Sequence, residues 1–359
     1  MIGHRELLSG RPAVGRSVRM AGRVEADRRG KCQVDVLSDV LRAVHLTGAV
    51  YFDITARQPW VAASPPVTSI CGKVMPGFDH VIAFHIMMDG WCWAQLADES
   101  QPEVRLEAGD AVVFVRGDAH IMSTEPGERA APDFGIYYRP NDRPLPFIFN
   151  EFGGSGEKSR FVCGYLGCDA RPFNPILDAL PPILHVKHSS VGGQLTHDLI
   201  RVALQEKENP RAGGETILSK LSELMFLQAV REYIESLPGE STGWLAALRD
   251  RHIGAALRLM HGRPAEAWTL DSLAREVGLS RSVFAERFAD VMGTPAMAYL
   301  GNWRLQLAGR LLASQGVSIA QAAAKVGYES EASFNRAFKK QVGVPPGAWR
   351  RARRPASPS

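Results

Sequence analysis

The first half of the chain alternates between short apolar runs and turn residues, a pattern typical of an all-β region. From Ala49 to about Pro182 the apolar runs read AVYFDIT, VIAFHIMM, WCWAQL, AVVFV, FGIYY and RFVCGYL. Asp89-Gly90 separates two of these runs and predicts a β-hairpin, because this dipeptide suits the tight turns that join antiparallel strands. Many short strands at this spacing predict a β-sandwich or barrel of the jelly-roll type.

Helical spacing replaces this pattern on both sides of the predicted strands. Apolar residues recur every three or four positions within residues 34–46, 194–207 and 215–237. The turn residues of Pro238–Gly243 then predict a linker. We expect a loose tail at 1–33, a strand-rich domain at 34–237, a linker at 238–246, a helical domain at 247–354 and a short tail at 355–359.

The last hundred residues contain one pattern twice. The first copy runs from Thr269 to Pro295 and the second from Ser318 to Pro345, with an offset of 49 before the central turn and 50 after it. The matching pairs are Gly278 with Gly327, Phe284 with Phe334, Phe288 with Phe338, Gly293 with Gly343 and Pro295 with Pro345. Each copy predicts a helix-turn-helix, and residues 295–314 predict a helix that joins the two copies.

Local signals support both copies. Hydroxyl side chains at the predicted helix starts suit N-caps, because their oxygens satisfy free backbone N–H groups; these residues are Thr269, Ser280, Ser318 and Ser330. Gly278 and Gly327 predict turns with positive φ, which glycine adopts without steric cost. The second helices are expected at 281–292 and 331–342. Their phenylalanine pairs, spaced i and i+4, are expected to face the core.

The second helix of such a unit enters the major groove of DNA and reads base edges. Arg336 is the strongest candidate reader, since a guanidinium bonds two acceptors of guanine at once. Asn335 suits adenine, Ser282 suits several bases, and Glu286 is either a cytosine contact or a solvated surface acid. The candidate phosphate contacts are Arg281, Lys339, Lys340, Arg350 and Arg351. The alternative is a helical bundle without a ligand, but caps, turn glycines and phenylalanine pairs all recur in register.

Charge divides the chain in the same way. The net charge is +4, but residues 247–359 carry 17 Lys/Arg and 8 Asp/Glu, while residues 32–246 carry 17 and 27. A basic C-terminal part favours a polyanionic partner there. The first 20 residues lack the apolar core of a secretory signal, and no run of 18 apolar residues predicts a membrane span. The five cysteines form no Cys-x-x-Cys pair, so we expect reduced thiols and a cytoplasmic protein.

The C-terminal sequence resembles the DNA-binding domain of AraC/XylS-type transcription regulators. The resemblance covers about residues 247–354 and is most specific in GYESEASFNRAFKKQVGVPPGAWR. It implies a seven-helix domain with two helix-turn-helix units, most often in an activator that binds promoter DNA and RNA polymerase. It maps base contacts onto Ser282, Ala285, Glu286, Glu331, Ala332, Ser333 and Arg336. Ala285 and Ala332 depart from the commoner polar pattern of the family.

Residues 36–236 resemble the cupin-type sensor domain of a subgroup of these regulators. The stretches LSDVLRAVHLTGAVYFDITARQPW, FHIMMDGWCW and LEAGDAVVFVRGDAHIM carry this resemblance. His120 fits the second cupin motif, and His80 and His85 lie near the first, but no His-x-His pair or following Glu is present. We therefore expect no metal and no cofactor, although two or three imidazoles suit a metal ion. We expect His80, His85, Trp91 and His120 to line a small-molecule pocket. The alternatives are histidines bonded to backbone carbonyls and a tryptophan packed in the core.

The expected fold is an α+β multidomain chain, with a cupin-like barrel and flanking helices before an all-α domain with two helix-turn-helix units. The expected function is a sequence-specific, effector-responsive transcription regulator without a catalytic site. The expected partners are promoter DNA, a small-molecule effector, RNA polymerase and a second copy of the chain, which the helices 194–207 and 215–237 would bind. The rival hypothesis is a cupin-type metalloenzyme that carries a DNA-binding appendage.

Overall fold

The computed structural model describes residues 34–137, 147–188, 212–313 and 316–353, together with residues 194, 195, 197–199, 201, 202 and 205. Residues 34–359 belong to one compact unit. The expected tail at 1–33 lies outside the described residues, whereas the expected helix at 194–207 is described in part, and its described residues are helical. Within the described part of the chain, no helix combines the length and the apolar character that crossing a membrane requires.

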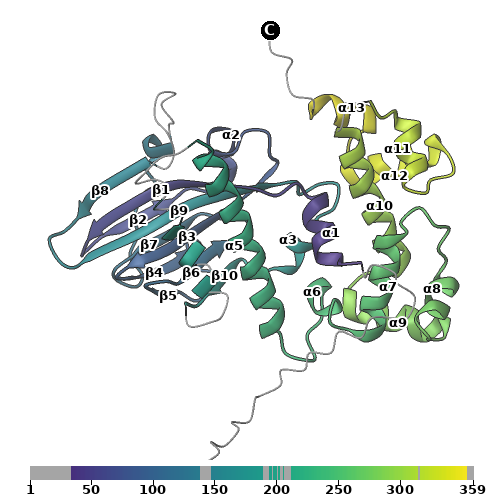
Figure 1. The fold of residues 1–359 in the computed structure, drawn as a ribbon, viewed down its shortest axis with the longest axis horizontal. Coiled ribbons are helices and arrows are strands. Elements are labelled where there is room, and N and C mark those ends of the chain that lie inside the picture. The colour runs from purple at the N-terminus through teal and green to yellow at the C-terminus, as the bar shows by residue number, and fades with distance from the viewer. Residues whose placement is uncertain are drawn as a thin grey trace, which may run out of the picture. The chain divides into compact units, whose positions relative to one another are not determined.

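The strands form one six-stranded sheet in the order β10-β6-β3-β9-β1-β8 and one four-stranded sheet in the order β2-β7-β4-β5 (Figure 1). Their bounds are β1 Thr47–Arg57, β2 Val61–Ser64, β3 His80–Asp89, β4 Trp91–Leu96, β5 Val104–Glu107, β6 Ala111–Phe114, β7 His120–Ser123, β8 Phe147–Gly153, β9 Lys158–Cys168 and β10 Ile183–Val186. Neighbouring strands are antiparallel except for β1 and β8. The expected cupin-like architecture is confirmed.

Both faces of the six-stranded sheet are buried along its central strands. Phe161 on one face joins Cys92 and Met122 of the smaller sheet in a shared core. Phe84 and Ile86 on the opposite face pack with the long helix α5, Gly214–Ser236, which crosses the sheet in Figure 1. A strand that buries both faces has no need of polar alternation, which explains the unbroken apolar run of β3.

Two local predictions in the strand-rich part are wrong. The chain does turn at Gly90, where φ is 78°, but β3 and β4 belong to different sheets and form no hairpin. The turn instead carries the chain from one sheet to the other. The run FGIYY was expected to be a strand, but Phe134–Tyr137 forms a 3-10 helix. An apolar run of four or five residues does not distinguish these structures by its periodicity.

The remaining helices of the strand-rich part are short. They are α1 Val36–Ala43, the 3-10 helix Val67–Ser69, α2 Cys71–Val74 and α3 Pro175–Ala179. Asp35 caps α1, because its carboxylate accepts a hydrogen bond from the backbone N–H of Ser38. The predicted helices at 34–46 and 215–237 thus appear as α1 and α5, each within a few residues of the expected ends.

The C-terminal part is helical throughout, as expected. Its helices are α6 Trp244–Ala247, α7 Arg251–Gly262, α8 Leu270–Glu276, α9 Arg281–Met292, α10 Ala296–Ala313, α11 Ile319–Lys325, α12 Glu331–Val342 and α13 Pro346–Ala352. The bounds of α9 and α12 coincide with the predicted second helices of the two units. The ends of α5 and α6 leave residues 237–243 as the connection, at the place where the sequence predicts a linker.

Candidate functional site

The two helix-turn-helix units are built by the same local contacts. The hydroxyls of Thr269 and Ser318 accept hydrogen bonds from the N–H groups three residues later, which completes a capping box in each copy. Gly278 and Gly327 take φ values of 74° and 87°, as predicted. A Cβ added at Gly327 would also lie 2.7 Å from the Ala265 carbonyl oxygen, so any other residue would have to displace this backbone segment.

The helix α9 presents a polar face away from its core. Phe284 and Phe288 are completely buried, which turns the opposite side of the helix outward. Of the predicted contacts on this helix, Arg281, Ser282 and Glu286 are exposed, and Ala285 is half-buried. The exposed polar side chains are therefore accessible to a duplex that approaches α9.

The helix α12 presents a more basic face. Phe334 and Phe338 are completely buried, as in the first copy. The exposed predicted contacts are Glu331, Ala332, Arg336, Lys339 and Lys340, while Ser333 and Asn335 are half-buried. The Ser333 hydroxyl donates a 2.8 Å hydrogen bond to the Ser330 carbonyl oxygen, so its proton is already used at the N-cap. Arg336 forms no ion pair with any other described residue, which leaves its guanidinium available.

A buried polar cluster joins the two sheets in the strand-rich part. Nε2 of His85 on β3 lies 2.7 Å from Nε2 of His120 on β7. Nδ1 of His85 lies 2.7 Å from the Cys163 sulfur on β9, and Nδ1 of His120 lies 2.9 Å from the Asp118 carbonyl oxygen. Phe114 stacks on His120 with ring centroids 3.8 Å apart. The side chains of His85, His120 and Cys163 are almost completely buried.

The Asp118 carbonyl oxygen fixes the protons of this cluster, because it can only accept a hydrogen bond. Nδ1 of His120 must therefore donate, which leaves Nε2 of a neutral His120 to accept from His85. Nδ1 of His85 then accepts from the Cys163 thiol. The result is one directed chain of hydrogen bonds, from Cys163 through His85 and His120 to the backbone.

Burial keeps every member of the chain neutral. It lowers the pKa of His120 to about 4. The pKa of His85 lies well below 6.5, first because of burial and then because a charged His120 would repel a second proton. Burial also raises the pKa of the Cys163 thiol well above its ordinary value. These directions agree with the proton assignment, in which two neutral imidazoles and one thiol share the cluster.

The structure brings together two of the four residues expected to line a small-molecule pocket. His80 instead bonds the Val115 carbonyl oxygen through Nε2 at 2.8 Å, which was the alternative interpretation of this histidine. Trp91 is half-buried on β4, and the Arg105 guanidinium lies 4.9 Å from its ring centroid. Neither has a hydrogen bond or ring contact with His85 or His120 among the described residues.

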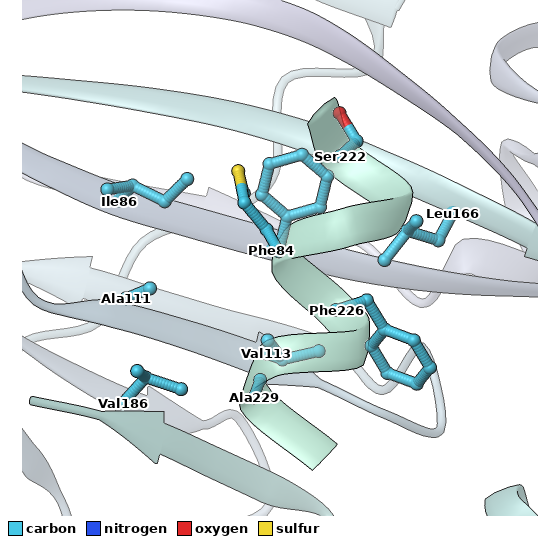
Figure 2. A pocket seen from close by; sticks show the side chains of 10 residues that line it. Phe84, Ile86, Ala111, Val113, Leu166, Val186, Ser222, Phe226 and Ala229 are labelled. Carbon is cyan, nitrogen blue, oxygen red and sulfur yellow. The ribbon is translucent and has the colours of Figure 1, made fainter. Parts of the chain in front are cut away.

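An apolar crevice lies on the other face of the six-stranded sheet (Figure 2). Its cavity volume is about 10 Å³, which is about the space of one water molecule. The lining comes from β3, β6, β9, β10 and α5 and consists of Phe84, Ile86, Ala111, Val113, Leu166, Val186, Ser222, Met225, Phe226 and Ala229. Ser222 provides the one hydroxyl, which donates to the Leu218 carbonyl oxygen. The crevice is therefore apolar but too small to hold a ligand in this structure.

Comparison with known proteins agrees with this geometry. Residues 35–235 match the Cupin family, and residues 273–352 match a helix-turn-helix domain family. The transcriptional regulator AlkR of Acinetobacter baylyi is 30% identical over 325 residues, which is 88% of this chain and 99% of AlkR. The chain belongs to the AraC-type transcription regulators with an N-terminal cupin domain.

Two further AraC-type relatives share much of the chain. An AraC-like transcription regulator of Streptomyces lividans is 29% identical over 271 residues, 76% of this chain and 87% of the relative. The RCS-specific transcriptional activator RclR of Escherichia coli is 33% identical over 208 residues, 56% of this chain and 71% of RclR. All three relatives are named as transcription regulators, and this chain carries the matching helix-turn-helix domain, so it is a DNA-binding transcription regulator too.

The cupin cluster of this AraC-type chain does not fit a cupin metal centre. Within the described residues there is no group of three or more His, Cys, Asp or Glu side chains arranged around one metal ion. Cys163 lies at one ring nitrogen of His85 and His120 at the other, so the three side chains do not converge on one position as the ligands of a single ion do. We therefore derive no metal chemistry for this cluster.

Cys163 and Val283 are two residues that the sequence analysis missed. Cys163 was assigned to an apolar strand, and its partner His85 lies 78 positions away in the chain. Val283 lies beside Ser282 on α9 and is 48% exposed. The sequence could have indicated Val283, because it is an apolar residue on the helix face that was assigned to polar contacts.

Proposed function

We propose that this AraC-type regulator is an activator that reads promoter DNA mainly through α12. The observation that carries the proposal is the exposed face of α12. Arg336, Lys339 and Lys340 are exposed there, while the phenylalanines of the same helix are buried in its core. Arg336 reads a guanine through its two donors, and the lysines bind phosphates on either side. The name of the E. coli relative, a transcriptional activator, supports activation, with RNA polymerase as the protein partner.

The first unit makes the second set of DNA contacts. Ser282 and Glu286 meet base edges, Arg281 binds a phosphate, and Val283 contacts a thymine methyl group. The spacer α10 fixes the separation of α9 and α12. Successive major grooves on one face of a duplex lie about 34 Å apart, so a single chain is suited to two adjacent groove segments.

The cupin region serves as the sensor and not as an enzyme. A small-molecule effector acts on the barrel that contains His85 and His120, where a buried polar chain is sensitive to any added donor or acceptor. Ile217 and Leu224 leave exposed apolar positions seven residues apart on α5, which supports a homodimer through this helix. The regulator works in the cytoplasm, next to its DNA.

Fluorescence anisotropy of the full-length protein tests this proposal. The probes are the DNA upstream of its own gene and a scrambled duplex, each across a salt series. A specific regulator binds the upstream DNA tighter by about 10³ or more, with a steep salt dependence. Equal and weak affinity for both duplexes would reject that DNA as the operator, and no binding at low salt would reject the function.

A further inference from the structure

The spacer helix α10 contacts the cupin region through a buried glutamine. Gln306 is 1% exposed, and its amide nitrogen donates a 3.0 Å hydrogen bond to the Ala43 carbonyl oxygen. Its amide oxygen accepts a 2.9 Å hydrogen bond from the Phe173 N–H. A buried amide is stable only where its polar atoms are bonded, so these two backbone groups fix the place of α10 against the cupin region.

A second contact is made possible by a missing side chain. Gly309 lies one turn beyond Gln306 on α10, and a Cβ added there would lie 2.9 Å from the Pro172 ring. The segment 169–174 therefore approaches the spacer more closely than any other residue at 309 would allow. The Asp169 N–H donates to the Val44 carbonyl oxygen at 2.8 Å, which ties this segment to the end of α1.

The third contact is an arginine held by two carboxylates. Arg353 follows α13 directly, bonds Asp169 and reaches Asp79 at 2.5 Å. Its guanidinium also lies 3.9 Å from the ring centroid of Trp349. The other carboxylate oxygen of Asp79 accepts a 2.8 Å hydrogen bond from the Ala170 N–H. These side chains are partly buried, so salt screens the ion pairs less than it screens pairs on an open surface.

The two carboxylates lie at the ends of the strands that carry the buried cluster. His80 and Cys168 are register partners at one end of β3 and β9, and Asp79 and Asp169 adjoin them. His85 and Cys163 are register partners on the same two strands. The buried cluster and the two carboxylates are therefore joined to the same pair of hydrogen-bonded strands.

The two helix-turn-helix units are joined to the cupin region by different physical means. The first unit shares one apolar core with α1 and α5, which includes Val40, Phe226 and Phe288. The second unit has a separate apolar core, which includes Phe334, Phe338 and Trp349. The first unit is thus joined by a shared apolar core, whereas the second is joined by the hydrogen bonds of Gln306, the close approach of Pro172 to Gly309 and the ion pairs of Arg353.

We propose that Asp79 and Asp169 hold the second helix-turn-helix unit through Arg353, and that the cupin region thereby sets how freely this unit moves. The partner is a segment of the same chain. Two carboxylates at the paired ends of β3 and β9 bind the guanidinium at the end of the DNA-binding part. Gln306 anchors the near end of the same unit.

Hydrogen–deuterium exchange of the full-length, DNA-free protein tests this inference. The variants are Arg353→Gln and the double substitution Asp79→Asn with Asp169→Asn, all close in size to the native residues. The matched controls are Arg310→Gln, an exposed arginine on α10, and Asp178→Asn on α3. The Arg353→Gln variant and the double variant at Asp79 and Asp169 should each accelerate exchange in α11–α13 by about tenfold, because local opening no longer has to break the ion pairs. The amides of α8 and α9 and both controls should stay within about twofold of the wild type.

A triple variant that combines the substitutions at Arg353, Asp79 and Asp169 provides the decisive comparison. If the three residues act through one contact, the triple substitution accelerates α11–α13 no more than either variant alone. Unchanged exchange in α11–α13 would overturn the inference. Equal acceleration of α8–α9 and α11–α13 would also overturn it, because it would assign these residues a general stabilising role.

Discussion

Equivalent positions of the two recognition helices carry opposite charges. Glu286 on α9 corresponds to Arg336 on α12, and both side chains are exposed. The basic residues are also distributed unequally, since Arg287 on α9 is held by Asp250 at 2.7 Å while Lys339 and Lys340 on α12 are exposed. The two units therefore present different chemistry to DNA, despite their common framework.

Replacement of Arg336 tests base reading by the second unit. Arg336→Ala should lower affinity for operator DNA by about 1–3 kcal/mol and relax specificity at one base pair, because two base-directed donors are lost. Lys339→Ala is the control and should weaken binding to all sequences equally. Anisotropy on a panel of single-base operator variants measures both effects. A uniform loss for Arg336→Ala would assign it to the phosphates instead.

The buried imidazoles predict a stability that depends on pH. In the folded protein the pKa of His120 is about 4 and that of His261, which is also buried, is about 3. An unfolded histidine titrates near 6.5, so between these values only the unfolded state gains the protons. The free energy of unfolding should thus be highest above about pH 6.5 and fall by up to about 1.4 kcal/mol per pH unit per histidine on acidification towards pH 4.

Urea unfolding at several pH values between 7.5 and 4.5 measures this slope. His120→Gln removes one titrating group. The slope of the unfolding free energy against pH should therefore decrease by the contribution of about one proton. An identical slope in the variant would mean that His120 is accessible and charged in the folded protein. The prediction applies to the effector-free protein, because it depends on the burial of these histidines.

At the scale of the element, local signals were sufficient for the helical part and insufficient for the sheets. The N-cap at Ser280 and the turn at Gly327 depend on residues within a few positions, so the sequence predicts them directly. The hairpin at Asp89-Gly90 failed because its turn signal does not specify which sheet the next strand joins. Cys163 was missed for the same reason, since strand pairing between β3 and β9 decides its neighbour.

The two turn glycines provide a matched test of local structure. Gly278 has positive φ and nothing within 4 Å of an added Cβ, whereas a Cβ at Gly327 would collide with the backbone of Ala265. Gly278→Ala should therefore cost about 1 kcal/mol of backbone strain, and Gly327→Ala should cost more, about 2–4 kcal/mol. Chemical denaturation of the two variants measures the difference. Equal losses would show that the Ala265 segment moves aside freely.

At the scale of the whole molecule, composition and repeats predicted the order of the parts but not how they share cores. The sequence predicts two separate domains, at 34–237 and 247–354. In the structure, one apolar core includes α1, α5 and helices of the first unit, from Val40 to Leu257 and Phe288. No periodicity along the chain reveals this, because each helix shows only that it has an apolar face and not what covers it.

Two identical truncations should separate the shared core from the separate one. Leu257 lies in the core shared with the cupin region and Leu312 in the core of the second unit, and both are essentially unexposed. Each Leu→Ala change should cost about 2–5 kcal/mol, because it removes buried methyl groups and leaves a cavity. Since α1 packs on α7, Leu257→Ala should also accelerate hydrogen exchange in α1, whereas Leu312→Ala should accelerate it in α11 and α12 and leave α1 unchanged. Acceleration limited to α7–α9 in the first variant would show that the cupin region and the first unit open independently.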